Sequence, residues 1–246
     1  MPRDWDAGAY DRLPIPMTRW GEVVVGWLEL GGDERVLDAG CGTGRVTERL
    51  LERLPRGTVV ALDGSPSMID QARDRLGEAR VEYLVHDLLE PIPTAPVDAV
   101  LSTATFHWVP DHDRLFANLA AVLEPGGQLA AQCGGAGNTA ELAHVVRELG
   151  YDLEEDKVFA GPDETRARLE RAGFVDVETW LHPEPTPIPR GDLELYLQTI
   201  CLGSVIRRVP DGDRSAFLEE AADRLPGGVI DYVRLNIRAR RASAPR

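Results

Sequence analysis

The spacing of hydrophobic positions along the chain changes near residue 33. Residues 1–31 form a helical, amphipathic pattern that stops at Gly31-Gly32. Its apolar positions recur at i, i+3, i+4, i+7 and i+8, and they are Trp20, Val23, Val24, Trp27 and Leu28. After this pattern, short apolar runs alternate with helical ones, which is typical of a parallel sheet with helices on its faces.

The first five apolar runs predict strands, and helical patterns separate most of them. The expected strands are residues 35–40, 58–63, 81–87, 97–104 and 126–134, and the expected helices are 44–54, 65–76 and 113–124. Ser65 as an N-cap followed by Pro66 is a strong signal for a helix start. A doubly wound sheet of this kind binds its ligand beyond the carboxyl ends of the strands.

After Gly135 the pattern weakens. Residues 141–149 and 163–173 are helical, and residues 174–182 alternate like a strand. Residues 183–192 contain four prolines, which predict a connector that is neither helix nor central strand. Two helices are expected within residues 192–225, and a last strand over residues 229–241. The expected fold is therefore α/β, with a doubly wound, seven-stranded, mostly parallel sheet.

Composition narrows the possible partners. The chain has 246 residues, with 27 Lys+Arg against 41 Asp+Glu and a net charge of −14. Because this charge repels phosphate backbones and anionic membranes, we expect no nucleic acid partner and no membrane partner. The amino terminus has no apolar signal core and no apolar run reaches the ~18 residues of a membrane span, so a cytoplasmic protein is expected.

Three widely separated cysteines, Cys41, Cys133 and Cys201, form no C-x-x-C pair. A disulfide framework or a zinc site is therefore not expected, and we predict buried free thiols and no metal site.

The stretch VLDAGCGTGRV, residues 36–46, ends a predicted strand with three alternate glycines. A dinucleotide fingerprint G-x-G-x-x-G/A fails at Arg45 and Thr47, and a phosphate-binding loop of the G-x-x-x-x-G-K-[ST] type also fails at Arg45. A purely structural interpretation, in which the glycines permit a tight turn, stays open on this stretch alone.

Acidic residues at the ends of the predicted strands favour a nucleoside ligand. Asp63 lies 19 positions after Gly44, where a carboxylate can accept from both ribose hydroxyls. Asp87 can accept from an adenine amino group while Leu88 packs on the ring, and Asp38 is expected at the mouth of the first strand. An ammonium, a carboxylate, a ribose and an adenine together fit S-adenosylmethionine.

The chain resembles the class I S-adenosylmethionine-dependent methyltransferases. VLDAGCGTG matches their D-x-G-x-G-x-G motif, and VVALDGSPSMIDQAR, VHDL and LEPGGQL match three later motifs in order, within about residues 33–135. The segments DRLPIPMTRWG, STATFHWVPDH and DYVRLNIRARR resemble the trans-aconitate methyltransferase-like branch. The resemblance implies cofactor contacts at Asp38, Gly40, Cys41, Gly42, Asp63, Gly64, Met68, Asp87, Leu88 and Ser102.

The resemblance also implies a division of one methyltransferase domain. Residues 1–31 are expected to form a helical lid over the cofactor, residues 33–182 the cofactor-binding core, residues 183–228 a helical cap and residues 229–241 the last strand. The substrate pocket is expected to be lined by Tyr10, Trp20, His107, Trp108 and Asn138. Arginines that are candidates for binding a substrate carboxylate are Arg190, Arg207, Arg208, Arg234, Arg238, Arg240 and Arg241.

Methyl transfer is an in-line displacement in which alignment in a dry pocket does most of the work. A carboxylate acceptor is ionised at pH 7 and needs no base, whereas a phenol, amine or carbon acceptor would use one, and His107 is the candidate. We expect O-methylation of a small carboxylic acid by a monomer or homodimer. Two alternatives stay open: methylation of another metabolite with His107 as base, and a non-catalytic S-adenosylmethionine-binding module.

Overall fold

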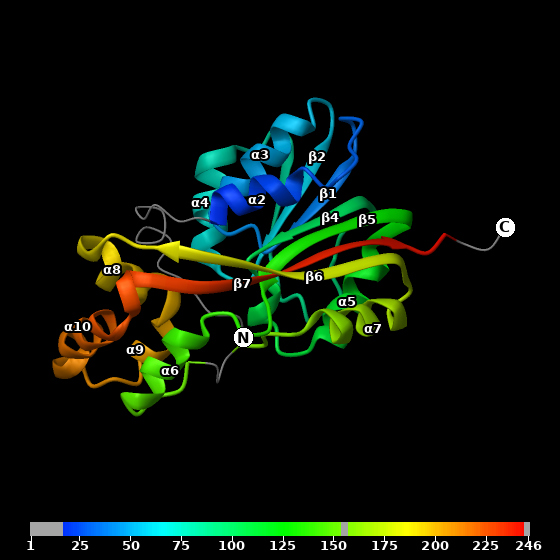
Figure 1. Ribbon diagram of the computed structural model, residues 1–246. Coiled ribbons are helices and arrows are strands. Elements are labelled where there is room, and N and C mark those ends of the chain that lie inside the picture. The colour runs from blue at the N-terminus through cyan, green and yellow to red at the C-terminus, as the bar shows by residue number, and fades with distance from the viewer. Residues whose placement is uncertain (1–16, 154–156, 244–246) are drawn as a thin grey trace.

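The computed structural model describes residues 17–153 and 157–243. Within them, seven strands form one sheet in the order β3-β2-β1-β4-β5-β7-β6 (Figure 1). Strands β1 to β5 pair in parallel, while β7 is antiparallel to both of its neighbours, β5 and β6. The strand order reverses between β1 and β4, which is where such a sheet opens a crevice for a ligand.

The strands lie close to the predicted ranges. They are β1 (Arg35–Ala39), β2 (Thr58–Asp63), β3 (Val81–Val85), β4 (Val97–Thr103), β5 (Leu123–Gly134), β6 (Phe174–Pro187) and β7 (Val229–Arg241). The helices are α2 (Met17–Val25), α3 (Arg45–Arg53), α4 (Pro66–Leu76), α5 (His112–Val122), α6 (Ala140–Glu148), α7 (Pro162–Arg171), α8 (Arg190–Tyr196), α9 (Gly203–Ile206) and α10 (Arg214–Arg224). Ser65 caps α4, since its hydroxyl accepts from the Met68 amide.

Alternation along the strands supplies a hydrophobic core on each face of the sheet. Val36 of β1 faces helices α2, α3 and α4, whereas its neighbour Leu37 faces α5 and α7 on the opposite side (Figure 1). Both side chains are fully buried. Burial on both faces explains why these strands are continuous apolar runs in the sequence.

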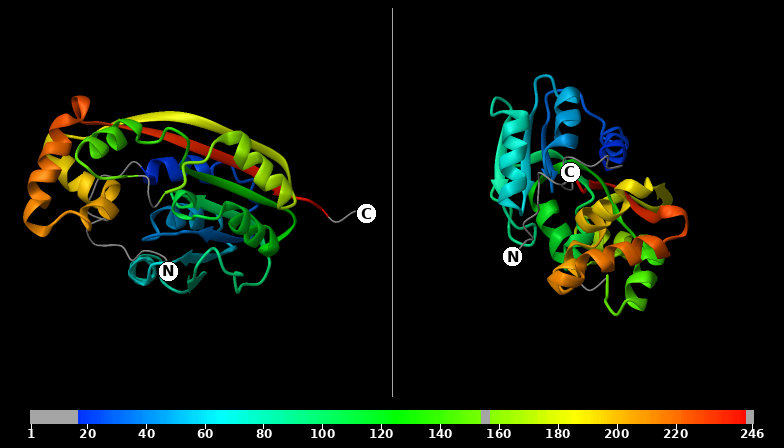
Figure 2. Two further views of the ribbon diagram at one scale, coloured as in Figure 1. Left: turned by 90° about the horizontal axis from the view of Figure 1, so that it is seen from below. Right: turned by 90° about the vertical axis from the view of Figure 1, so that its left-hand side faces the viewer.

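A third core lies beside the sheet. Strands β6 and β7 extend beyond the other strands and carry α8, α9 and α10, with α6 packed against them (Figure 2). We call these four helices the cap. Its apolar cluster includes Leu142 and Val146 of α6, a helix that lies within the predicted cofactor-binding core rather than within residues 183–228.

Two other details differ from the sequence prediction. Helix α2 ends at Val25, before Gly26, instead of continuing to Gly31. Residues 190–224 form three α-helices, a π-helical turn (Leu197–Cys201) and a short 3-10 turn (Asp211–Asp213), instead of two helices.

The proline-rich connector expected after residue 182 is in fact a continuation of strand β6. Pro183, Pro185 and Pro187 pair in register with alternate residues of β7. The strand tolerates them because β6 is at the edge of the sheet, where a residue whose backbone faces outward needs no ladder N–H.

Candidate active site

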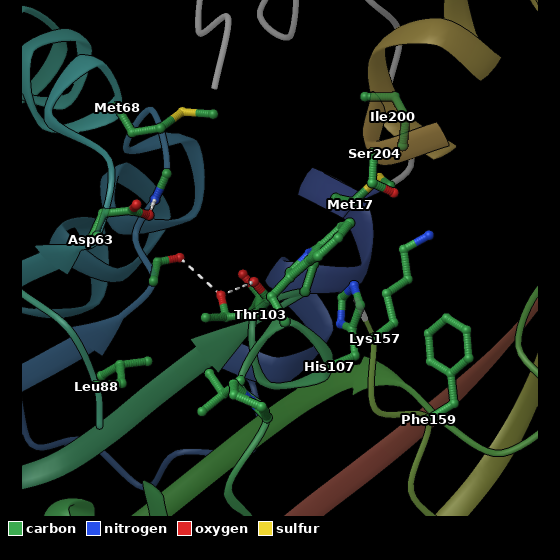
Figure 3. A pocket seen from close by; sticks show the side chains of 18 of the residues that line it. Met17, Asp63, Met68, Leu88, Thr103, His107, Lys157, Phe159, Ile200 and Ser204 are labelled. Carbon is green, nitrogen blue, oxygen red and sulfur yellow. Dashed lines mark hydrogen bonds between the residues drawn. The ribbon is translucent and has the colours of Figure 1, made fainter. Parts of the chain in front are cut away.

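A cavity of about 770 Å³ opens where the parallel strands end, between the sheet and the cap (Figure 3). Its lining falls into two groups, and Figure 3 shows Asp63, Met68 and Leu88 of the first on the side opposite His107, Lys157 and Phe159 of the second. The glycine-loop end includes Gly40, Gly42, Asp63, Gly64, Met68, Asp87 and Leu88, and the cap end includes His107, Trp108, Asn138, Lys157, Phe159, Ile200, Ser204, Arg207, Tyr232 and Arg234.

The glycine loop between β1 and α3 needs its glycines for two different reasons. Gly40 has φ +88°, and a Cβ there would collide with the side chain of Thr105, which follows β4. Gly42 has φ +55°, and a Cβ there would meet no described atom within 4 Å. Because Gly42 lines the cavity, its missing side chain leaves space within the cavity itself.

Asp63, at the end of β2, holds this loop in shape. One carboxylate oxygen accepts from the Gly42 amide and the other from the Ser65 amide, each at 2.9 Å. A carboxylate offers about four acceptor positions, so the same group can also receive hydroxyls of a ligand in the cavity.

Asp87 follows β3, and one of its oxygens accepts from the Leu89 amide at 3.0 Å. Leu88 and Met68 stand on the same side of the cavity in Figure 3 and are both buried. A flat apolar group would fit between side chains of this kind, next to an acceptor at Asp87.

Asp38 lies behind the glycine loop, not at the mouth of the cavity where it was expected. It is 1% exposed, and Thr47 of α3 donates to one oxygen at 2.7 Å. The other oxygen, Oδ1, has no hydrogen-bond partner among the described residues. Burial, assisted by the charge of Asp63, raises the pKa of Asp38 to about 7.

Ser102 and Cys41, two further predicted cofactor contacts, also lie behind the cavity wall. The Ser102 hydroxyl donates to the Ala39 carbonyl at 2.6 Å and so ties β4 to β1. Cys41, Cys133 and Cys201 are buried free thiols, as predicted. Burial raises the pKa of Cys133 to about 12 and that of Cys201 to about 11, which keeps both thiols protonated.

His107 is neutral, and its tautomer is set by the backbone. Its Nδ1 accepts from the Gly134 amide at 3.3 Å, so the proton of a neutral ring is on Nε2. Burial, followed by the charges of Arg234 and Lys157, holds the pKa of His107 well below its ordinary value. The His107 ring stacks on the Phe159 ring, with 5.9 Å between the ring centroids. The histidine is therefore held in place, and its Nε2–H is a hydrogen-bond donor of fixed orientation at the cavity.

Among the residues that the structure describes, the basic side chains at the cap end are Lys157, Arg207 and Arg234. Lys157 extends beside His107 in Figure 3, donates to the Cys201 carbonyl at 3.2 Å and lies 5.1 Å from the Trp108 ring centroid. Sequence reasoning did not select it, although it is the single lysine of the chain. Its being the one lysine in the sequence was the signal that could have marked Lys157 as a candidate site residue.

The remaining substrate-side predictions have mixed outcomes. Trp108 and Asn138 line the cavity, and Trp20 lies behind it, against Arg234 and Tyr232. Tyr10 lies outside the described residues. The other candidate arginines have partners elsewhere: Arg190 binds Glu194 and Asp223, Arg208 the Asp152 carbonyl, Arg238 Glu178, Arg240 Glu29 and Arg241 the Leu123 carbonyl.

Known proteins are similar to this chain in sequence and in fold. Residues 36–127 match the family described as a methyltransferase domain. The trans-aconitate 2-methyltransferase of Methylobacterium nodulans is 34% identical over 179 residues, which cover 72% of this chain and 67% of that protein. The enzyme of the same name from Variovorax paradoxus is 40% identical over 129 residues, or 52% of this chain and 49% of that protein. The chain belongs to the class I S-adenosylmethionine-dependent methyltransferases.

Solved structures agree on the fold of this methyltransferase. Phosphoethanolamine N-methyltransferase 2 of Haemonchus contortus, in complex with S-adenosyl-L-methionine, has a TM-score of 0.63 at 18% identity and covers 92% of this chain and 53% of that one. The curated relatives named above are matched over about half to two thirds of their length.

S-adenosylmethionine is the cofactor of the family, and the glycine-loop end fits it. The space left by Gly42 and the acceptor oxygens of Asp63 and Asp87 along the cavity wall are what a ligand with an amino-acid end, a ribose and an adenine would require there. Among the described residues, no cluster of side chains could hold a metal ion, and none of the described helices has the length and apolarity to cross a membrane.

Proposed function

We propose that this methyltransferase transfers a methyl group to a carboxylate oxygen of a small carboxylic acid. The observation that carries the proposal is the separation of charge along the cavity. Asp63 and Asp87 line the glycine-loop end, and Lys157, Arg207 and Arg234 line the cap end. In a chain with net charge −14, three cations gathered at one end of a cavity favour an anionic acceptor.

The names of the curated relatives point the same way, since both of the relatives named above are trans-aconitate 2-methyltransferases. Their acceptor is an acid, and methylation of an acid suits the groups present. Within the proposal, Asp63 binds the ribose of the cofactor, while Asp87 and Leu88 bind its adenine.

When bound, S-adenosylmethionine supplies a methyl group on a positively charged sulfur. Transfer to a carboxylate oxygen would replace the carbon–sulfur bond of the donor by a carbon–oxygen bond, giving a methyl ester and S-adenosylhomocysteine. The negative charge of the acceptor and the positive charge of the sulfur would disappear together, without movement of a proton. A cavity that excludes water favours such a step over reaction in solution.

His107 has the right protonation for an acceptor of this type. Its Nδ1 lone pair is engaged by the Gly134 amide and its pKa is lowered, so it is poorly suited to remove a proton. As a donor through Nε2, it would orient a carboxylate that needs no activation. Lys157, next to it, would add a positive charge.

Incubation of the purified protein with S-adenosylmethionine and two matched panels tests the proposal, with products identified by mass spectrometry. One panel holds di- and tricarboxylic acids, and the other holds phenols, amines and the amides of the same acids. We expect methyl esters from the first panel only. Products from phenols or amines, with none from acids, would overturn the proposal.

A further inference from the structure

A chain of three buried polar side chains crosses strands β5 and β7 and ends at the cavity. Gln132 of β5 and Asn236 of β7 are partners in register, and Gln132 Nε2 donates to Asn236 Oδ1 at 2.8 Å. Arg234, two residues before Asn236 and therefore on the same face of β7, donates from Nε to Gln132 Oε1 at 3.4 Å. Arg234 lines the cavity, whereas Gln132 and Asn236 lie behind it.

Asn236 and Arg234 occupy the two ends of the Gln132 amide. A glutamine amide has a donating end and an accepting end. Because Asn236 Oδ1 takes the donating end, the accepting oxygen is left for Arg234 Nε. The reverse orientation would bring the NH₂ group of Gln132 against the N–H of Arg234. Gln132 is 7% exposed, Asn236 2% and Arg234 3%, so water cannot easily replace a lost hydrogen-bond partner.

Trp20 holds the guanidinium from its flat side. The Cζ atom of Arg234 lies 4.7 Å from the Trp20 ring centroid, and the Trp20 ring meets Tyr232 edge-on at 5.2 Å. The hydrogen bond at Nε and the aromatic face act together on the orientation of the guanidinium plane. A planar cation whose orientation is already set loses little freedom when it binds an anion.

We propose that Gln132 and Asn236 are positioning residues for the methyl acceptor, which act through the orientation of Arg234 without touching the acceptor. This inference rests on the proposed function, because it takes Arg234 to bind an anionic group of the acid. A contact with a part of the acid that does not react persists from the bound acid to the transition state. Its loss should therefore raise the acceptor KM more than it lowers kcat.

The first test is Gln132→Leu, which keeps the size of the side chain and removes its amide. We expect the acceptor KM to rise about tenfold, with kcat within about twofold and the Kd of S-adenosylmethionine unchanged. Gln128→Leu is the matched control. Gln128 is on the same strand and bonds the backbone of Glu29 in both directions, away from the cavity. The control should leave the acceptor KM unchanged.

A double-mutant cycle separates positioning from general loosening of the fold. Lysine at position 234 has no Nε–H for Gln132, so Gln132→Leu should have almost no effect on the acceptor KM in an Arg234→Lys background. If the two substitutions instead multiply their effects on KM, Gln132 acts on something other than Arg234. The proposal would then be wrong.

A third measurement needs no acceptor. The Nε–H resonance of Arg234, assigned by its loss in Arg234→Lys, should exchange slowly with solvent in the unaltered protein and fast in Gln132→Leu and Asn236→Leu. If no acid is methylated, the proposed function fails, and slow exchange lost in both variants still supports the positioning role. Fast exchange in the unaltered protein, or exchange that neither substitution changes, overturns it.

Discussion

The two ends of the cavity are built in different ways. The glycine-loop end is made by the backbone turn after strand β1 and by carboxylates at or just after the ends of strands β2 and β3. The cap end is made by side chains from several loops and turns, from helix α9 and from antiparallel strand β7, which are far apart in the sequence. One end is a product of the strand-to-helix turns, and the other is assembled by tertiary packing.

This difference has a consequence for variation within the fold. A glycine with positive φ in such a turn cannot be replaced by a residue with a side chain without backbone strain. A cation such as Arg207, which is exposed at the end of α9, can be exchanged without moving the sheet. The same scaffold can therefore keep its methyl donor while the acceptor changes.

Gly42→Val should break the glycine-loop end with the largest effect. The valine side chain would occupy the space that the ligand needs, so we expect S-adenosylmethionine affinity to fall by at least about 100-fold in calorimetry. Gly77→Val is the matched control, because Gly77 also has positive φ (+67°) and open space but lies off the cavity. Equal affinities in the two variants would mean that the loop does not bind the cofactor.

Asp63→Ala should have the next largest effect. It removes an acceptor for the ribose and also releases the Gly42 and Ser65 amides, so cofactor affinity should fall by about 2–3 kcal/mol, or roughly 30- to 150-fold. Asp70→Ala, an exposed site on α4, controls for loss of a carboxylate. A loss below threefold for Asp63→Ala would place the ribose elsewhere.

His107→Ala should have the smallest effect, and it tests the cap end. Since the pKa of His107 is lowered, the ring is neutral above its ordinary value of 6.5, and kcat/KM for an acid should show no histidine step between about pH 6.5 and 9. We expect the substitution to lower kcat/KM about three- to tenfold at every pH in that range.

His112→Ala is the control for this prediction, because His112 is also buried but donates to the Phe106 carbonyl away from the cavity. A loss of roughly 10²–10⁴-fold in His107→Ala, with a rate that rises through a histidine pKa in the unaltered protein, would identify a general base instead.

The sequence predicted the glycine-loop end of the cavity better than the cap end. Apolar runs, glycine turns and the Ser65-Pro66 helix start depend on local rules, and they located the strands and most of the glycine-loop end. Asp38 was misplaced by the same rules, because alternation along β1 turns its side chain towards Thr47 of α3 instead of the cavity.

The cap end depends on contacts that have no local signature. Nothing in the sequence around Lys157 indicates that it reaches the Cys201 carbonyl. Nothing around Arg234 distinguishes it from Arg238 and Arg240 on the same strand, which bind Glu178 and Glu29 away from the cavity. Only the packing of β7 beside β5 and α2 brings Arg234 to the cavity.

The prolines of strand β6 have a further consequence for how this protein behaves when concentrated. An exposed sheet edge is a template on which a strand from another molecule can assemble, by exchanging N–H and C=O groups. At Pro183, Pro185 and Pro187 the outer edge of β6 has no N–H to offer at alternate positions. The outer edge of β6, the longest strand of the sheet, therefore offers few N–H donors to a strand from another molecule. Self-association through edge pairing is opposed along the stretch that supports the cap.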